Sequence, residues 1–555
     1  MAATTRIFCV SSLAGAMTLA AALDAGLFAP DGRRLLLVAH RAEVPETTPA
    51  PDALPGFARL RGRFDEVLSW NAVIAPFHPA AWSPRPDDVP LWERYLRGLW
   101  RLGDDEVRLV VESVQESPSL ALCQVFTGAP VDVLADGLAV YGPTGEKIDP
   151  LVGTRVGRLL HTGAAPGLTP LLLAEYGVPS VPVPAEALTK VAGELAEDQA
   201  PLPAPDGAPV TRADGGPGGT AAGNTGTTTA TPDHQSPGQT ADTPAHGSPG
   251  RAADTPDHDN PGQTADTGNT ADTADTADTP HHGNAGQTAD TPPRGNPGTT
   301  ADTPARQNTG PSADTPARAP AGGTRALLLA EGLAARGLLS PAGERELLRR
   351  TVRDAVALGH RHLVLRPPPG APARWSHPLE EEAARLGAHC SVLAPGLPAE
   401  AALVLARPAL VVGCLSAALL TAPERYGVPA ARMATGPLPA RLTPYAHPDR
   451  PALTLVDALV PELGAPPGAA PPREEVAALL DAVAFAMRPA VRPDLRAAAE
   501  AYLSRHLDAR TRRYFPRRRL AALALPGAVP ARLEFLPRSP AVRRLARRAR
   551  SLTRR

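Results

Sequence analysis

The sequence predicts an α/β protein made of two Rossmann-like halves separated by a long low-complexity segment. Strand-like and helix-like segments alternate in residues 1–195 and again in residues 324–510, and this alternation is typical of parallel sheets covered by helices on both faces. Residues 196–323 are rich in Thr, Asp, Pro and Gly. Two such halves facing each other would leave a cleft at the carboxyl ends of their strands, where ligands usually bind.

The first half begins with an apolar strand and a turn that opens a helix. Arg6–Val10 is the strand, Ser11–Gly15 is a turn of small residues, and Ala16–Ala25 is expected to be a helix that ends at Gly26. The pattern continues with strand Leu35–Val38, helix 91–100, strand Val107–Val111, helix Ser117–Phe126 and strand Val131–Leu134.

The second half repeats the alternation. It starts with an apolar strand at Arg325–Leu329 and a helix over 341–358 that Ser340 is expected to cap. It continues with strand His362–Leu365, helix Leu379–Leu386, strand Ser391–Leu393 and strand Ala409–Val412.

The segment 196–323 is predicted to be disordered. The sequence GQTADT recurs at positions 238, 262 and 286, and almost no aliphatic or aromatic residue follows Val210. Because such repeats have no apolar positions to stack, they cannot offset the entropy of ordering the chain.

Composition limits the class of protein. The formal net charge is −1, from 56 basic and 57 acidic residues, so overall charge does not indicate a nucleic-acid partner. The cysteines form no C-x-x-C pair and suit a reducing cytoplasm. No apolar run approaches the ~20 residues of a membrane span, and Ser11, Ser12 and Gly15 interrupt the N-terminal run that could otherwise be a signal peptide. The arginine-rich composition suggests a GC-rich bacterial source.

Residues 511–555 form a basic tail in which a helix is expected. Its apolar residues follow near-helical spacing from Val542 to Leu552, among many arginines. Such a helix could lie on an anionic membrane surface, and a simply solvated tail fits the pattern equally well. Aromatic residues are not interleaved with the arginines, which disfavours nucleic-acid binding.

Candidate functional residues follow the predicted strands. Ser12 lies in the first turn, Glu112 follows Val107–Val111, and Asp136 follows Val131–Leu134 on an Asp-Gly turn. In the second half, Gly413 and Ser416 lie at an expected helix N-terminus, where amides can bind phosphate. Each position is also compatible with an ordinary turn or a solvated loop.

The motifs together resemble the bacterial α-2,8-polysialyltransferase-like glycosyltransferases, in particular an actinobacterial branch. The resemblance rests on RIFCVSSLAGAMTLAAALDAG, FDEVLSWN, VVESVQESPSLAL and DVLADGLAVYGPT in the first half, and on ARGLLSPAGERELL, LVLRPPP and ALVVGCLSAALLTAPERYGVP in the second. It implies a GT-B fold and metal-free transfer of sialic acid from CMP-sialic acid to a glycan acceptor.

The resemblance also assigns roles to individual residues. It implies that Asp136 is the general base and that Arg366, Gly413 and Ser416 contact the nucleotide sugar. Ser12 and Glu112 are candidates for binding the acceptor or a sugar from their positions after strands alone. Two motif positions depart from the family pattern: Ala135 replaces the first acidic residue, and Pro368 replaces the histidine of a His-Pro motif. The remaining His-Pro pairs begin at His78, His377 and His447.

Three functions are compatible with these features. The leading hypothesis is a glycosyltransferase that uses a nucleotide sugar without a metal or other cofactor. The missing histidine favours a second hypothesis, a catalytically degenerate relative that acts as a binding or assembly module. A third is an interaction protein that acts through the insert and the basic tail.

Overall fold

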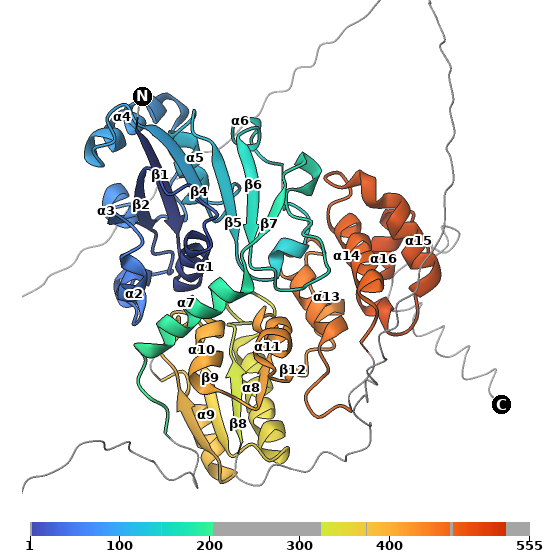
Figure 1. The fold of residues 1–555 in the computed structure, drawn as a ribbon. Helices are drawn as coiled ribbons and strands as arrows, with labels where there is room; N and C mark the ends of the chain where they lie inside the picture. The colour runs from blue at the N-terminus through green and yellow to red at the C-terminus, as the bar shows by residue number, and fades with distance from the viewer. Residues whose placement is uncertain (1–2, 146, 204–323, 373, 467–469, 529–555) are drawn as a thin grey trace, which may run out of the picture. The chain divides into compact units, whose positions relative to one another are not determined.

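The computed structural model describes residues 3–145, 147–203, 324–372, 374–466 and 470–528 (Figure 1). The repeat region for which disorder is predicted, from residue 204 on, and the tail helix expected around Val542–Leu552 lie outside these ranges. Residues on both sides of the insert belong to one compact unit, which Met1–Val210 and Ala317–Arg555 form together.

The first half contains a seven-stranded sheet in the order β3-β2-β1-β4-β5-β6-β7, and every neighbouring pair is parallel. The interior strand β1 is buried because helices cover both faces of the sheet, which explains its continuous apolar run. The strands are β1 Thr4–Val10, β2 Arg33–Val38, β3 Glu66–Ser69, β4 Glu106–Val111, β5 Val131–Ala135, β6 Val156–His161 and β7 Ser180–Pro182.

The second half contains a five-stranded sheet in the order β10-β9-β8-β11-β12, also parallel throughout. Its central strand β8 pairs with β9 and β11, so residues that follow these three strands emerge at one edge. The strands are β8 Arg325–Leu329, β9 His362–Arg366, β10 His389–Val392, β11 Leu410–Gly413 and β12 Ala430–Arg432. The predicted α/β class with two parallel sheets is confirmed.

Local chemistry explains where the principal helices begin. The side chain of Ser12 accepts a hydrogen bond from the Gly15 amide and caps α1, and Ser340 caps α8 in the same way through Gly343. The longer helices are α1 Leu13–Asp24, α4 Val89–Leu99, α5 Ser119–Val125, α7 Ala185–Glu197, α8 Pro341–Ala357, α9 His377–Arg385, α10 Ala399–Ala406, α11 Ala418–Tyr426, α13 Arg450–Leu459, α14 Arg473–Met487 and α15 Arg496–His506. The shorter ones are α2 Phe57–Arg61, α3 Trp70–Ile74, α6 Pro150–Gly153, α12 Leu438–Arg441 and α16 Arg517–Ala522.

Helix α7 connects the two halves. It packs against α1 of the first half and against α10 of the second (Figure 1). Near its C-terminal end, Glu194 accepts a hydrogen bond from Arg63 at 2.9 Å, and Arg63 also bonds Asp24 at the end of α1. A second connection joins the Arg425 guanidinium of α11 to the carbonyl of Thr162.

The described chain returns to the place where it enters the insert. The guanidinium of Arg325, the first residue of β8, donates a hydrogen bond to the carbonyl of Pro203. The insert therefore leaves and rejoins the described part of the molecule at adjacent points. Of the helices in the described ranges, none has the length and apolar character that crossing a bilayer requires.

Candidate functional site

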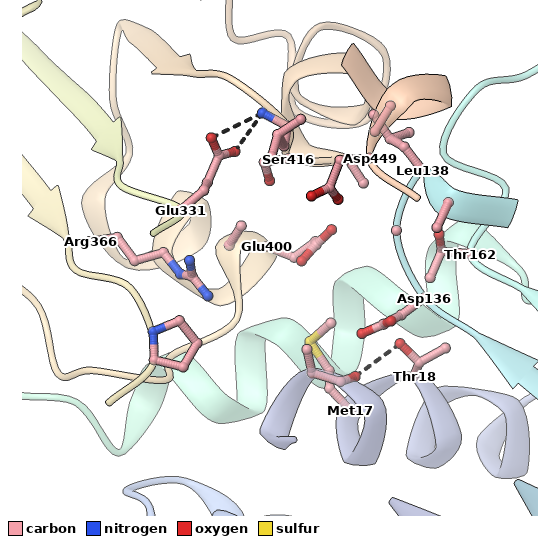
Figure 2. A pocket seen from close by; sticks show the side chains of 18 of the residues that line it. Met17, Thr18, Asp136, Leu138, Thr162, Glu331, Arg366, Glu400, Ser416 and Asp449 are labelled. Atoms are coloured by element: carbon pink, nitrogen blue, oxygen red, sulfur yellow. Dashed lines mark hydrogen bonds between the residues drawn. The ribbon is translucent and has the colours of Figure 1, made fainter. Parts of the chain in front are cut away.

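A cavity of about 340 Å³ lies between residues of the two halves (Figure 2). This volume is within the range of small-molecule sites. Side chains and backbone from the strand ends of both sheets line it, together with parts of α1, α7, α10 and α13. The polar lining residues are Thr18, Asp136, Thr162, Glu331, Arg336, Arg366, Glu400, Ser416 and Asp449.

Asp136 is the principal polar residue on the first-half side of the cavity. It directly follows β5, and Gly137 adopts a positive φ of 74° that turns the chain after it. The side chain is exposed and lines the cavity. Desolvation by the surrounding cavity wall raises the pKa of Asp136, while the charge of Arg336 opposes this effect. A carboxylate with a raised pKa at a strand end is suited to general-base chemistry.

Arg366 brings positive charge to the opposite side. It is the last residue of β9, and its Nε donates a hydrogen bond to the carbonyl of Leu397, which fixes the guanidinium beside the cavity. Burial lowers its pKa, and the charges of Glu331 and Glu400 oppose that shift. Arg366 remains charged because an arginine titrates far above neutral pH.

In the proline run after Arg366, the residue that lines the cavity is not Pro368, which stands at the histidine position of the His-Pro motif. Pro369 lines the cavity. Pro368 lies against Gly332 instead: a Cβ built on Gly332 would be 3.4 Å from the Cβ of Pro368.

The turn after β11 already has an anion on its amides. The carboxylate of Glu331 accepts hydrogen bonds from the Cys414 amide at 2.8 Å and from the Leu415 amide at 2.9 Å. Ser416 lines the cavity, whereas Gly413 is buried beneath it with Glu331 nearby. Two of the amides expected to face phosphate therefore bind the side chain of a residue that follows β8.

A similar carboxylate occupies the first turn of the other half. Glu112 accepts from the amide of Ser11 at 3.0 Å and from its hydroxyl at 2.5 Å. Desolvation raises the pKa of Glu112 to about 7, the charge of Asp136 adds to this, and the Ser11 hydrogen bonds oppose it. Gly15 makes the arrangement possible, since a Cβ there would lie 2.2 Å from the Glu112 Oε1.

Ser12 and Glu112 line a second, larger cavity of about 760 Å³, which Asp136 also lines. Its basic lining residues are Arg41, Lys147 and Arg488. The structure therefore brings Ser12, Glu112 and Asp136 together, and it brings Asp136, Arg366 and Ser416 together. Asp136 belongs to both groups.

Besides Glu331, three charged residues of the first cavity were not singled out from the sequence. Arg336 and Asp449 form an ion pair at 2.8 Å. Glu400 lies in the first turn of α10, and Figure 2 shows its carboxylate reaching into the cavity between Arg366 and Asp136. Its only sequence signal was an acid in the first turn of a helix, which usually marks a solvated end.

No histidine in the described ranges lines the first cavity. His377 begins α9 and is exposed. His447 contacts residues of the cavity wall: its Nε2 lies 3.3 Å from the carbonyl of Arg336, which lines the cavity as Asp449 does. The other ring that begins a His-Pro pair, His78, contacts the Ala42 carbonyl. Within those ranges, no three His, Cys, Asp or Glu side chains gather as a metal site would require.

Two parallel α/β sheets with a polar, ligand-sized cavity at their strand ends define a general class of ligand-binding fold. A comparison with protein families is more specific. Residues 6–202 match the family model described as Alpha-2,8-polysialyltransferase (POLYST). The resemblance inferred from the sequence is confirmed over this segment, which contains Ser12, Glu112 and Asp136. No curated protein matches the chain.

Proposed function

We propose that this protein is a sialyltransferase-like glycosyltransferase that transfers a sugar from a nucleotide donor, with CMP-sialic acid as the expected donor, to a glycan acceptor. The observation that supports it most is the position of Asp136 within the matched segment. Asp136 lies between two cavities: one shared with Arg366 and Ser416, the other with Ser12 and Glu112.

Each cavity then receives one substrate. The donor occupies the first cavity, where Arg366 faces its phosphate and the Ser416 hydroxyl offers a further hydrogen bond. The acceptor occupies the second, larger cavity, so that its reacting hydroxyl reaches Asp136. Asp136 accepts the proton of that hydroxyl as the oxygen attacks the anomeric carbon from the side opposite the leaving nucleotide. In this proposal the two halves act as the acceptor and donor domains of a GT-B enzyme.

A degenerate, non-catalytic relative is a second candidate, and a specific observation favours it. Glu331 already holds the Cys414 and Leu415 amides, and no histidine lines the cavity in the described ranges. A site of this kind offers fewer donors to phosphate than one with free amides and an imidazole. It could retain glycan binding in the second cavity without transfer.

Nucleotide binding to the purified protein separates the two candidates. Calorimetric titrations with cytidine, uridine and guanosine monophosphates should show selective binding of the cytidine nucleotide. Arg366→Gln should weaken that binding by about ten- to a hundred-fold, because a charge-assisted hydrogen bond to phosphate is lost. Exposed Arg374→Gln, outside the cavity, is the matched control. Failure to bind any of the three nucleotides would contradict the donor site and leave the non-catalytic candidate.

A further inference from the structure

The first cavity has more acidic than basic groups, although the proposed donor is an anion. Four carboxylates line it, those of Asp136, Glu331, Glu400 and Asp449, against two guanidinium groups. A phosphate brought into such a site meets repulsion unless a carboxylate is neutral. The partners of each carboxylate indicate which one that is.

Two of the four are committed to partners within the protein. Asp449 pairs with Arg336 at 2.8 Å. Glu331 receives the amides of Cys414 and Leu415. Desolvation raises the pKa of Glu331, but these amides and the charge of Arg366 oppose the rise. Both carboxylates therefore have local compensation for a negative charge.

Asp136 and Glu400 have no such partner among the described side chains; each is stabilised only by its own backbone amide and by more distant charges. They differ in position. Asp136 lines both cavities and faces the acceptor, whereas Glu400 lines only the donor cavity, beside Arg366. Glu400 is therefore the carboxyl group positioned to meet the donor phosphate.

We propose that the protonated carboxyl group of Glu400 binds the donor phosphate and donates a hydrogen bond to the phosphate oxygen that leaves the sugar. This inference depends on the proposed function. When the acceptor oxygen forms its bond to the anomeric carbon, the bond between that carbon and the phosphate oxygen breaks and its electron pair stays on the phosphate. Glu400 stabilises this charge through its proton, and Asp136 takes the proton of the acceptor hydroxyl.

The surroundings of Glu400 favour its protonated form. Burial raises its pKa, and the charge of Asp136 raises it further. Arg425 of α11, Arg366 of β9 and the backbone amide at the start of α10 act in the opposite direction. Desolvation and the charge of Glu400 raise the pKa of Tyr426 on α11. An incoming phosphate adds negative charge and so favours the protonated form still more.

The substitution Glu400→Gln tests the inference, because the glutamine amide always carries donor hydrogens. Affinity for cytidine monophosphate should be measured for wild type and variant from pH 6 to pH 9. Taking the ratio of the two affinities at each pH cancels the pH dependence that comes from the ligand's own phosphate. At the acidic end of this range, where Glu400 carries its proton, wild type and variant should bind alike. As the pH rises through the raised pKa of Glu400, wild type should weaken by up to tenfold per pH unit relative to the variant.

Two further variants complete the experiment. Glu400→Ala, which has neither donor nor acceptor, should bind more weakly than the Gln variant at every pH. Exposed Glu381→Gln on α9 is the matched control for loss of one negative charge and should follow wild type. If Glu400→Gln binds more weakly than wild type at all pH values, Glu400 is an acceptor and the inference is overturned. A pH-independent ratio overturns it as well, while the cytidine site itself stands. Wild type that binds no nucleotide would instead remove the donor site.

Discussion

At the scale of single residues, the two cavities meet at Asp136. If Asp136 is the base, Asp136→Asn keeps the shape of the side chain and removes its ability to take a proton. Turnover should fall by about 100- to 10,000-fold, while calorimetry should find cytidine nucleotide binding retained. An Asn variant that turns over as wild type does would remove Asp136 from the mechanism.

Gly15 and Glu112 form a pair whose coupling can be measured. A methyl group at Gly15 would lie 2.2 Å from the Glu112 Oε1, so Gly15→Ala should displace the carboxylate from Ser11 and cost about 1.5–3 kcal/mol, the value of a hydrogen bond to a charged group. In a Glu112→Ala background, Gly15→Ala should instead stabilise α1 by about 0.5–1 kcal/mol, because Ala is a better helix former than Gly. Urea unfolding of the four proteins gives both values. An equal cost in both backgrounds would show that the two residues do not interact.

Sequence reasoning reached the residues that follow apolar strands but could not assign their partners. Asp136, Arg366 and Ser416 do line one cavity. Glu331 and Glu400 were missed because an acid before a glycine and an acid in a first helical turn are both ordinary surface patterns. Their position at the cavity depends on contacts between segments some 80 residues apart in sequence, such as Glu331 with Cys414, and no local pattern contains these.

At the scale of elements, the contact between α1 and α7 depends on a charge cluster. Hydrogen bonds from Arg63, with help from Lys190, lower the pKa of Asp24 to about 2. A carboxylate with a lowered pKa in the folded state stabilises the protein above its ordinary pKa near 4, and this contribution disappears as the pH falls toward 2.

Asp24→Asn should therefore cost about 1–2 kcal/mol at pH 7, allowing for solvent screening of a side chain that is 20% exposed. The difference between wild type and variant should shrink between pH 4 and pH 3, as measured by urea unfolding. Exposed Asp31→Asn, which removes a charge outside the cluster, should have little effect at either pH. A cost that does not change with pH would mean that Asp24 contributes through packing.

The predicted elements agree with the structure where apolar runs are continuous. The strand Arg325–Leu329 matches β8 at both ends, and Arg6–Val10 falls within β1. Helix α4 shows what periodicity leaves open. Its residues are helical as predicted, yet Leu91, Tyr95 and Leu99 are exposed while Leu96 is buried. Apolar residues occupy two faces of α4, and only tertiary contacts select the buried one.

At the scale of the whole molecule, the insert should be dispensable for folding. Its sequence has few apolar residues to contribute to a core, and Pro203 contacts Arg325 across it. Replacement of residues 204–323 by a short Gly/Ser linker should leave the thermal midpoint almost unchanged in a melting experiment. A scrambled insert of the same composition is the matched control. Loss of a cooperative transition would show that the natural segment contributes to the fold.

The hydrogen bond between Pro203 and Arg325 also bears on how this chain can change in length. A loop that starts and ends at neighbouring points has no span to bridge, so its repeats can be gained or lost without shifting either sheet. For a flexible loop, each doubling in length costs only about 0.6 kcal/mol of closure entropy. Relatives with very different numbers of the GQTADT repeat could therefore share one folded body, and the repeat count would be free to follow selection on properties other than stability.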